Sequence, residues 1–158
     1  MDQINNCLKE LMVTTSLLNL ARYMQHGDTN CLWHSIAVAY YSLFLVRLLR
    51  IPCNLHSMLI GALFHDYFLY DWHDKDPSHR FHGFRHPGTA LRNIRKIREL
   101  NPIEIDIISK HMFPLTPIPP VYRESVIVCI VDKCCSIYEV FCRNTYKSLK
   151  SRCIITEA

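Results

Sequence analysis

Residues 54–66 read NLHSMLIGALFHD, an apolar run that ends in a histidine and an aspartate. The residues just before this pair, 59–64, contain no ionisable side chain. An imidazole and a carboxylate in apolar surroundings cost several kcal/mol unless something compensates them, and a metal ion is the usual compensation. Gly61 and Ala62 are small enough to let a neighbouring helix approach closely. The stretch therefore predicts a buried helix with a metal-binding pair, His65 and Asp66, at its end.

The helical pattern continues on both sides of this stretch. Apolar residues recur at helical spacing, and asparagine, glycine and proline mark where helices begin or end. About six helices are expected: one that ends near residues 26–27, and others at about 30–50, 54–66, 87–100, 102–111 and 122–148. The polar segment 71–84 (DWHDKDPSHRFHGF) predicts a loop. Strand-like alternation is not sustained anywhere, so the sequence predicts a compact all-α helical bundle with a single domain over residues 1–158.

The composition is that of an ordinary globular chain, with 49% apolar residues, 20% charged residues and a net charge of +4. The basic residues are scattered, apart from a group at residues 92–98 that favours a solvated helix face over a nucleic-acid surface. The eight cysteines form no CxxC motif, which favours reduced thiols in the core. We find no signal peptide and no uncharged apolar stretch of about 20 residues. We therefore expect a cytoplasmic protein without a membrane or nucleic-acid partner, and the oligomeric state stays open.

Other ionisable residues also fall on apolar helix faces. His34, His111 and Asp132 each have apolar neighbours one helical turn away. One such residue alone is more often a hydrogen-bonded core residue than a ligand, and nine histidines place some in suitable positions by chance. Several inward-facing ionisable groups are better explained jointly, as parts of one metal site.

The order of these residues resembles that in the HD-domain phosphohydrolases. The resemblance is carried by His34 in NCLWHSIAVAYYSL, by His65 and Asp66 in GALFHDYFLYD, and by Asp132 in IVCIVDKCCS. It covers about residues 28–140, the core of the expected domain. It implies the helical bundle of that family and a metal-dependent phosphohydrolase activity.

Two further histidines extend the resemblance to the dinuclear members of the family. His86 in HGFRHPGTAL and His111 in IISKHMFPL are similar to the positions that complete a two-metal site there. In length and first motif, the chain is most similar to the compact bacterial members that resemble dinucleoside-polyphosphate hydrolases. The chain lacks the lysine that often follows the HD pair and lacks the GYP motif of the cyclic-dinucleotide branch. A cyclic dinucleotide is therefore not the expected substrate.

Four imidazoles and two carboxylates make a nitrogen–oxygen donor set without thiolate, which suits Fe, Mn, Zn, Co or Ni. One divalent ion could be held by four of these residues: His34, His65, Asp66 and Asp132. A second could share Asp66 as a bridge and bind His86 and His111. Two ions about 3.5–4 Å apart activate a hydroxide and neutralise the attacking and leaving oxygens of a displacement. We therefore expect one or two divalent transition-metal ions and hydrolysis of a phosphate ester or anhydride of a small molecule, with a nucleotide as the favoured substrate.

Residues next to the ligands are candidates for contacts with the substrate. The expected phosphate contacts are Arg80, Arg85, Lys110 and Lys133. Adjacent helical residues lie about 100° apart, so exposure to solvent is the alternative for the two lysines. Asp66 is expected to act in catalysis as the bridging ligand, and His82 or His79 as the general acid that protonates the leaving group.

Two other functions stay open at this point. Some HD-domain proteins use the same six ligand types in a mixed-valent di-iron oxygenase, which predicts iron and no phosphatase activity. A non-catalytic module that senses a nucleotide is the other alternative. Six metal-competent side chains that face inward argue against that module.

Overall fold

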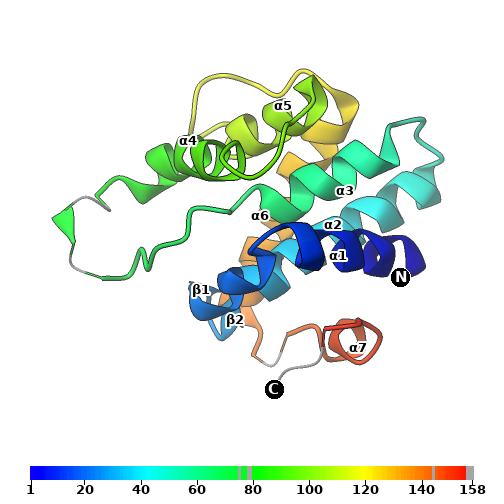
Figure 1. Ribbon diagram of the computed structural model, residues 1–158, viewed down its shortest axis with the longest axis horizontal. Helices are drawn as coiled ribbons and strands as arrows, with labels where there is room; N and C mark the ends of the chain where they lie inside the picture. Colours follow the sequence, from blue (N-terminus) through cyan, green and yellow to red (C-terminus); the bar gives the residue numbers. More distant parts are fainter. Residues whose placement is uncertain (75, 78–79, 144, 156–158) are drawn as a thin grey trace.

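The computed structural model describes residues 1–74, 76–77, 80–143 and 145–155 as a bundle of helices (Figure 1). The chain is 62% helix and 3% strand, which confirms the prediction of a compact, single-domain all-α bundle. The six longer helices are α1 (Asp2–Thr14), α2 (Cys31–Leu49), α3 (Leu55–Phe64), α4 (His82–Ile94), α5 (Pro102–Lys110) and α6 (Arg123–Phe141). The shorter elements are the 3-10 helix η1 (Leu17–Arg22), the antiparallel strands β1 (Met24–His26) and β2 (Thr29–Asn30), and α7 (Lys147–Lys150).

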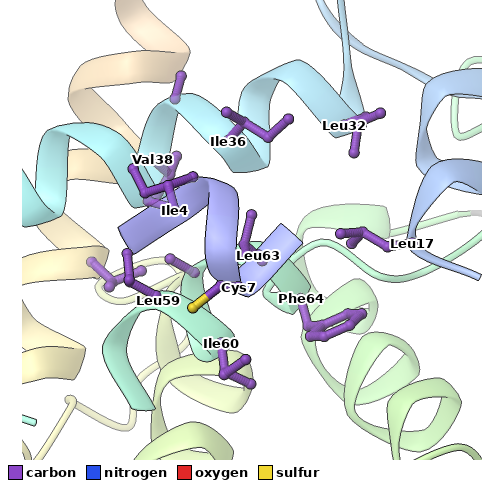
Figure 2. Packing of buried hydrophobic residues seen from close by; sticks show 14 of the residues in the cluster. Ile4, Cys7, Leu17, Leu32, Ile36, Val38, Leu59, Ile60, Leu63 and Phe64 are labelled. Atoms are coloured by element: carbon purple, nitrogen blue, oxygen red, sulfur yellow. The ribbon is translucent and has the colours of Figure 1, made fainter. Parts of the chain in front are cut away.

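Helices α2 and α3 lie at the centre of the bundle. α2 packs against α3 and α6, α3 packs also against α5, and α5 in turn contacts α4 (Figure 1). The buried apolar side chains form one contiguous cluster. Figure 2 shows Ile4 and Cys7 of α1 in this cluster, together with Val38 of α2 and Leu59 of α3. The two central helices therefore bury several faces at once, which explains their nearly continuous apolar sequences.

Side-chain caps fix where three of the helices begin. The side chains of Asn30 and Asn54 accept hydrogen bonds from backbone N–H groups in the first turns of α2 and α3. At α5, Asn101 and Glu104 form a reciprocal capping box, and Pro102 occupies the first helical position. The predicted starts of these helices are confirmed, and these are the helices that present four of the expected metal ligands.

The first helix is shorter than predicted. It ends at Thr14 instead of residues 26–27, because Thr15 is extended and the hydroxyls of both threonines donate to carbonyls of the last turn. The chain then forms η1 and the hairpin. Leu18 continues the helical apolar spacing of Ile4, Leu8 and Leu11, but it is 43% exposed whereas those three are buried.

The bounds of two later helices also differ from the prediction. α4 begins at His82, five residues before Pro87, since a proline in the second turn removes only one backbone hydrogen bond. α6 ends at Phe141 instead of residue 148, because the next residue, Cys142, is extended. The chain beyond it buries Tyr146 and Leu149 against the bundle, and this tertiary packing outweighs the local helical pattern.

Helix α2 is long and apolar enough, by length and composition, to cross a membrane. In the structure 61% of the most apolar 18-residue stretch of this helix is buried inside the bundle. The core helix of a globular protein meets the same criteria, and α2 is the central helix of this fold.

Close packing between α3 and α5 depends on Gly61. A Cβ atom added at Gly61 would lie 2.5–2.9 Å from three side-chain atoms of Ile107. The expectation that small residues admit a neighbouring helix is confirmed at this position. Any larger residue must push the two helices apart.

We predict that Gly61→Ala lowers the free energy of unfolding by about 1–3 kcal/mol, because overpacking outweighs the gain in helix propensity. Gly88→Ala in α4 is the matched control, since a Cβ there meets only the end of Arg92 at 3.6 Å. Its stability should stay equal or rise by up to about 1 kcal/mol. Chemical denaturation of both variants measures the difference, and equal stabilities would contradict the proposed close contact.

Candidate metal centre

The six predicted ligands come together from five helices. His34 lies on α2, His86 on α4 and Asp132 on α6, whereas His65 and His111 are the residues that end α3 and α5. All six residues, including Asp66, are at most 5% exposed. Their nitrogen and oxygen atoms form three overlapping groups in which all atoms lie within 4.8 Å of one another.

Asp66 stands at the centre of this cluster. Its Oδ1 lies 3.1 Å from His86 Nε2 and 3.4 Å from His111 Nε2. Its Oδ2 lies 3.3 Å from His65 Nε2 and 3.7 Å from His34 Nε2. Each oxygen of one carboxylate therefore faces a different pair of imidazoles.

Asp132 adds a second carboxylate to the pair of imidazoles that faces Asp66 Oδ2. Its Oδ1 lies 3.1 Å from His34 Nε2 and 3.5 Å from His65 Nε2. We call the group His34, His65, Asp66 and Asp132 the first subsite, and the group Asp66, His86 and His111 the second subsite. The two subsites share Asp66 and together contain every ligand predicted from the sequence.

Hydrogen bonds on the far side of three rings fix how the imidazoles are oriented. The Nδ1 atoms of His65, His86 and His111 lie 2.7–3.0 Å from backbone carbonyl oxygens one turn earlier in the chain. A carbonyl only accepts, so each Nδ1 carries a proton, and each ring in its neutral form presents the lone pair of its Nε2 to the cluster. This arrangement is typical of metal-ligating histidines.

Several buried atoms of the cluster lack the partner that this arrangement requires. His86 Nε2 and His111 Nε2 are 2.7 Å apart, so two lone pairs face each other unless a proton or a cation lies between them. His65 Nε2 and Asp66 Oδ1 are buried and make no hydrogen bond within the described chain. The mixed nitrogen and oxygen donors therefore fit a transition-metal ion, and the buried group could hold one.

Glu139 supports His34, and sequence analysis missed it. His34 Nδ1 donates to the Glu139 carboxylate, with both oxygens at 2.9 Å, and Tyr146 Oη donates to Glu139 Oε1 at 2.7 Å. Glu139 follows Asp132 by seven residues, which is two helical turns, so the two carboxylates share a face of α6. That spacing is a signal from which Glu139 could have been found.

A second missed residue contacts Asp66 from the hairpin. Gln25 Nε2 donates to Asp66 Oδ2 at 2.6 Å, and Cys31 Sγ donates to Gln25 Oε1 at 3.1 Å. No sequence pattern marks Gln25, because the segment was expected to be helical and its strand places it at the site only through tertiary structure.

Without a metal ion, the buried carboxylates stabilise positive charge on the imidazoles. Burial lowers the pKa of His34, but the hydrogen bonds that its ring donates to the Asp132 and Glu139 carboxylates outweigh burial and raise this pKa from 6.5 to about 9. Burial raises the pKa of Asp66, but the neighbouring imidazoles, His65 first, hold that pKa well below its usual range. Burial is also the main reason why the pKa of His111 is lowered. The cluster thus favours a positive charge at its centre, which a metal ion would supply.

A cavity of about 700 Å³ opens onto the cluster. Its floor includes four of the ligands: Asp66, His86, His111 and Asp132. His34 and His65 are not among the lining residues, so the second subsite is the one nearer the opening.

Two of the predicted substrate contacts line this cavity. Lys133 Nζ donates to the carbonyls of His111 at 2.6 Å and Cys129 at 3.2 Å, and its side chain is 37% exposed. His82 lies parallel to the ring of His86 at 4.5 Å, and its Nδ1 is 2.8 Å from Tyr70 Oη. His82 therefore lies in the cavity lining directly beside a residue of the second subsite.

The other predicted contacts do not reach the cavity. Arg80 and Arg85 are exposed and are absent from its described lining. Lys110 pairs with Asp106 one turn earlier on α5, at 2.5 Å, because the i, i+4 spacing brings the two side chains together. His79, the alternative general acid, lies outside the described residues.

No protein-family model, curated protein or solved structure matches this chain. The resemblance to HD-domain proteins therefore rests on the order of the six ligands along the chain. Their convergence on one buried carboxylate is an observation that stands without the resemblance.

We predict that Glu139→Gln weakens metal binding about 10- to 100-fold, because His34 loses its negatively charged partner. Glu124→Gln is the matched control: Glu124 is also buried on α6, but it accepts a hydrogen bond from Asn54 N at 2.6 Å. Competition with a chromogenic chelator measures the affinity of each variant. If both variants lose affinity equally, Glu139 has no specific part in the site.

Metal-free protein should lose stability as the pH rises from 6.5 to beyond 9. Protonated His34 stabilises the folded state fully below pH 6.5, and its contribution of about 3 kcal/mol disappears as the pH passes about 9. A bound metal ion requires neutral His34, so metal-loaded protein lacks this loss. Thermal unfolding with and without chelator measures this loss together with that of His65, whose pKa burial lowers but the carboxylates, Asp66 first, raise overall. Ionising thiols affect both forms alike. Parallel pH profiles for the two forms would refute this expectation.

Proposed function

We propose that the protein is a metal-dependent phosphohydrolase of the HD-domain type, which cleaves a phosphate ester or anhydride of a small molecule, with nucleotides as the favoured class. The observation that carries the proposal is the division of the Asp66 carboxylate between two groups of imidazoles. One shared carboxylate is the arrangement needed to hold two cations close together beneath a cavity of small-molecule size.

The reaction class follows from the donor set. Divalent transition-metal ions, when bound, would lower the pKa of a coordinated water and offset charge on phosphoryl oxygens. Asp66 and the backbone-anchored imidazoles would keep these ions fixed with little reorganisation.

Two side chains at the cavity have roles in this proposal. Lys133 supplies a positive charge that its carbonyl partners hold in place near Asp132. His82 would give a proton to the leaving oxygen, with Tyr70 orienting its ring through Nδ1. Lys133 and His82 both line the cavity, which meets the geometric condition for contact with a substrate.

We predict that Asp66→Asn reduces bound metal to below about 0.2 ions per chain and abolishes phosphatase activity, because neither subsite keeps its shared anionic ligand. His56→Ala, which removes an exposed histidine from α3, should leave both properties unchanged. The measurements are metal analysis of protein purified without chelator and a phosphatase screen over nucleotides and simple phosphate esters. Full activity in Asp66→Asn would exclude the proposal, as would iron-loaded parent protein that hydrolyses no phosphate ester.

A further inference from the structure

We propose that the substrate carries a single phosphoryl group on an apolar organic group, and that chains of two or more phosphates are disfavoured. This inference rests on the proposed function and specifies its substrate class. It comes from two properties of the cavity: the charge near its floor and the apolar character of one wall.

The positive charge of two bound metal ions would be nearly balanced by carboxylates of the protein itself. Three buried carboxylates, Asp66, Asp132 and Glu139, lie in or directly behind the subsites. Two divalent ions would exceed these carboxylates by one positive charge, and Lys133 adds one more. The resulting excess matches a phosphate monoester, which carries a charge of about −2 at neutral pH. A triphosphate would leave several negative charges without a partner in a partly enclosed site.

No further cation among the described lining residues is available for a phosphate chain. Lys133 is the one lysine or arginine in that lining, and two backbone carbonyls already accept hydrogen bonds from its Nζ. Lys110 is engaged by Asp106, and Arg80 and Arg85 are exposed and lie outside the described lining. Sites that bind several phosphates depend on bidentate arginines or several lysines, and the described lining has neither. The start of α4, at His82 and Gly83, is the one helix N-terminus in that lining, and its backbone amides could bind one phosphoryl group.

Another part of the cavity lining is apolar and suits an organic group. Met112, Pro114 and Leu115 follow the last ligand of α5 and line the cavity beside Gly83. Trp72 also lines it, with its ring already packed on His73 and His82 at centroid distances of 3.8 and 5.1 Å. A group next to the phosphate therefore meets aliphatic side chains, which favour an apolar surface over a second charged phosphate. This expectation differs from the polyphosphate substrate implied by the most similar HD-domain members.

The test compares binding of three inert probes to the metal-loaded protein: phenylphosphonate, methylphosphonate and tripolyphosphate. We expect phenylphosphonate to bind about tenfold more tightly than methylphosphonate, because its ring buries apolar surface, and also more tightly than tripolyphosphate. Calorimetric titration gives the affinities. Metal content after each titration shows whether a probe has removed the ions instead of binding to them.

Leu115→Lys should change this order. Leu115 is 47% exposed, so a lysine there adds a charge to the wall without disturbing the core. Tripolyphosphate should then bind severalfold more tightly and phenylphosphonate more weakly. Leu48→Lys is the matched control, because Leu48 is 63% exposed on α2 and is not part of the cavity; it should leave all three affinities unchanged.

The outcomes separate this inference from the function on which it rests. Tighter binding of tripolyphosphate than of phenylphosphonate by the parent protein, or equal binding of the two phosphonates, would overturn the substrate class alone. If loaded protein binds none of the probes and hydrolyses no phosphate ester, the proposed function fails as well. The expected order, changed by Leu115→Lys and not by Leu48→Lys, supports the inference.

Discussion

The carboxylate of Asp66 is buried at the point where five helices meet, and each of its oxygens lies within 3.1–3.7 Å of two imidazole nitrogens. A buried carboxylate is costly unless positive charge compensates it. Here the compensation comes from groups on α2, α4 and α5 as well as from its neighbour on α3. The packing of these helices and the electrostatics of the site are therefore parts of one constraint: the helices can separate only by leaving Asp66 without its partners.

The contact between α3 and α5 transmits core packing to this site. Gly61 and Ile107, which touch at the narrowest point, each precede a ligand by four residues, which is one helical turn. Their close approach places the rings of His65 and His111 with centroids 4.8 Å apart. Both histidines end their helices, and both bond a carbonyl three residues earlier. The ends of α3 and α5 thus share the same local geometry. Gly61, one turn before His65, sets the distance between these two helix ends.

Local signals in the sequence were sufficient for some features and insufficient for others. Asparagine caps and Pro102 mark helix starts because the capping interaction lies within a few residues of the chain. The ends of α1 and α6 depend on what the following segment buries, which no local pattern contains. Five of the six candidate ligands were predictable because ionisable groups on apolar faces are unusual, whereas His86 followed only from the resemblance to dinuclear HD-domain proteins. Gln25 was not, since an unremarkable glutamine reaches Asp66 only through a hairpin that the sequence did not indicate.

The two subsites differ in a way that bears on how such a site would work. The first subsite has the carboxylate of Asp132 in addition to one oxygen of the shared Asp66, with Glu139 behind His34, and neither of its histidines is in the described lining of the cavity. The second subsite has one shared carboxylate oxygen, and both of its histidines line the cavity. Greater negative charge and deeper burial favour firm retention of a cation in the first. A molecule that enters the cavity meets the second, so under the proposed function the inner ion would anchor the site while the outer one contacts the phosphate.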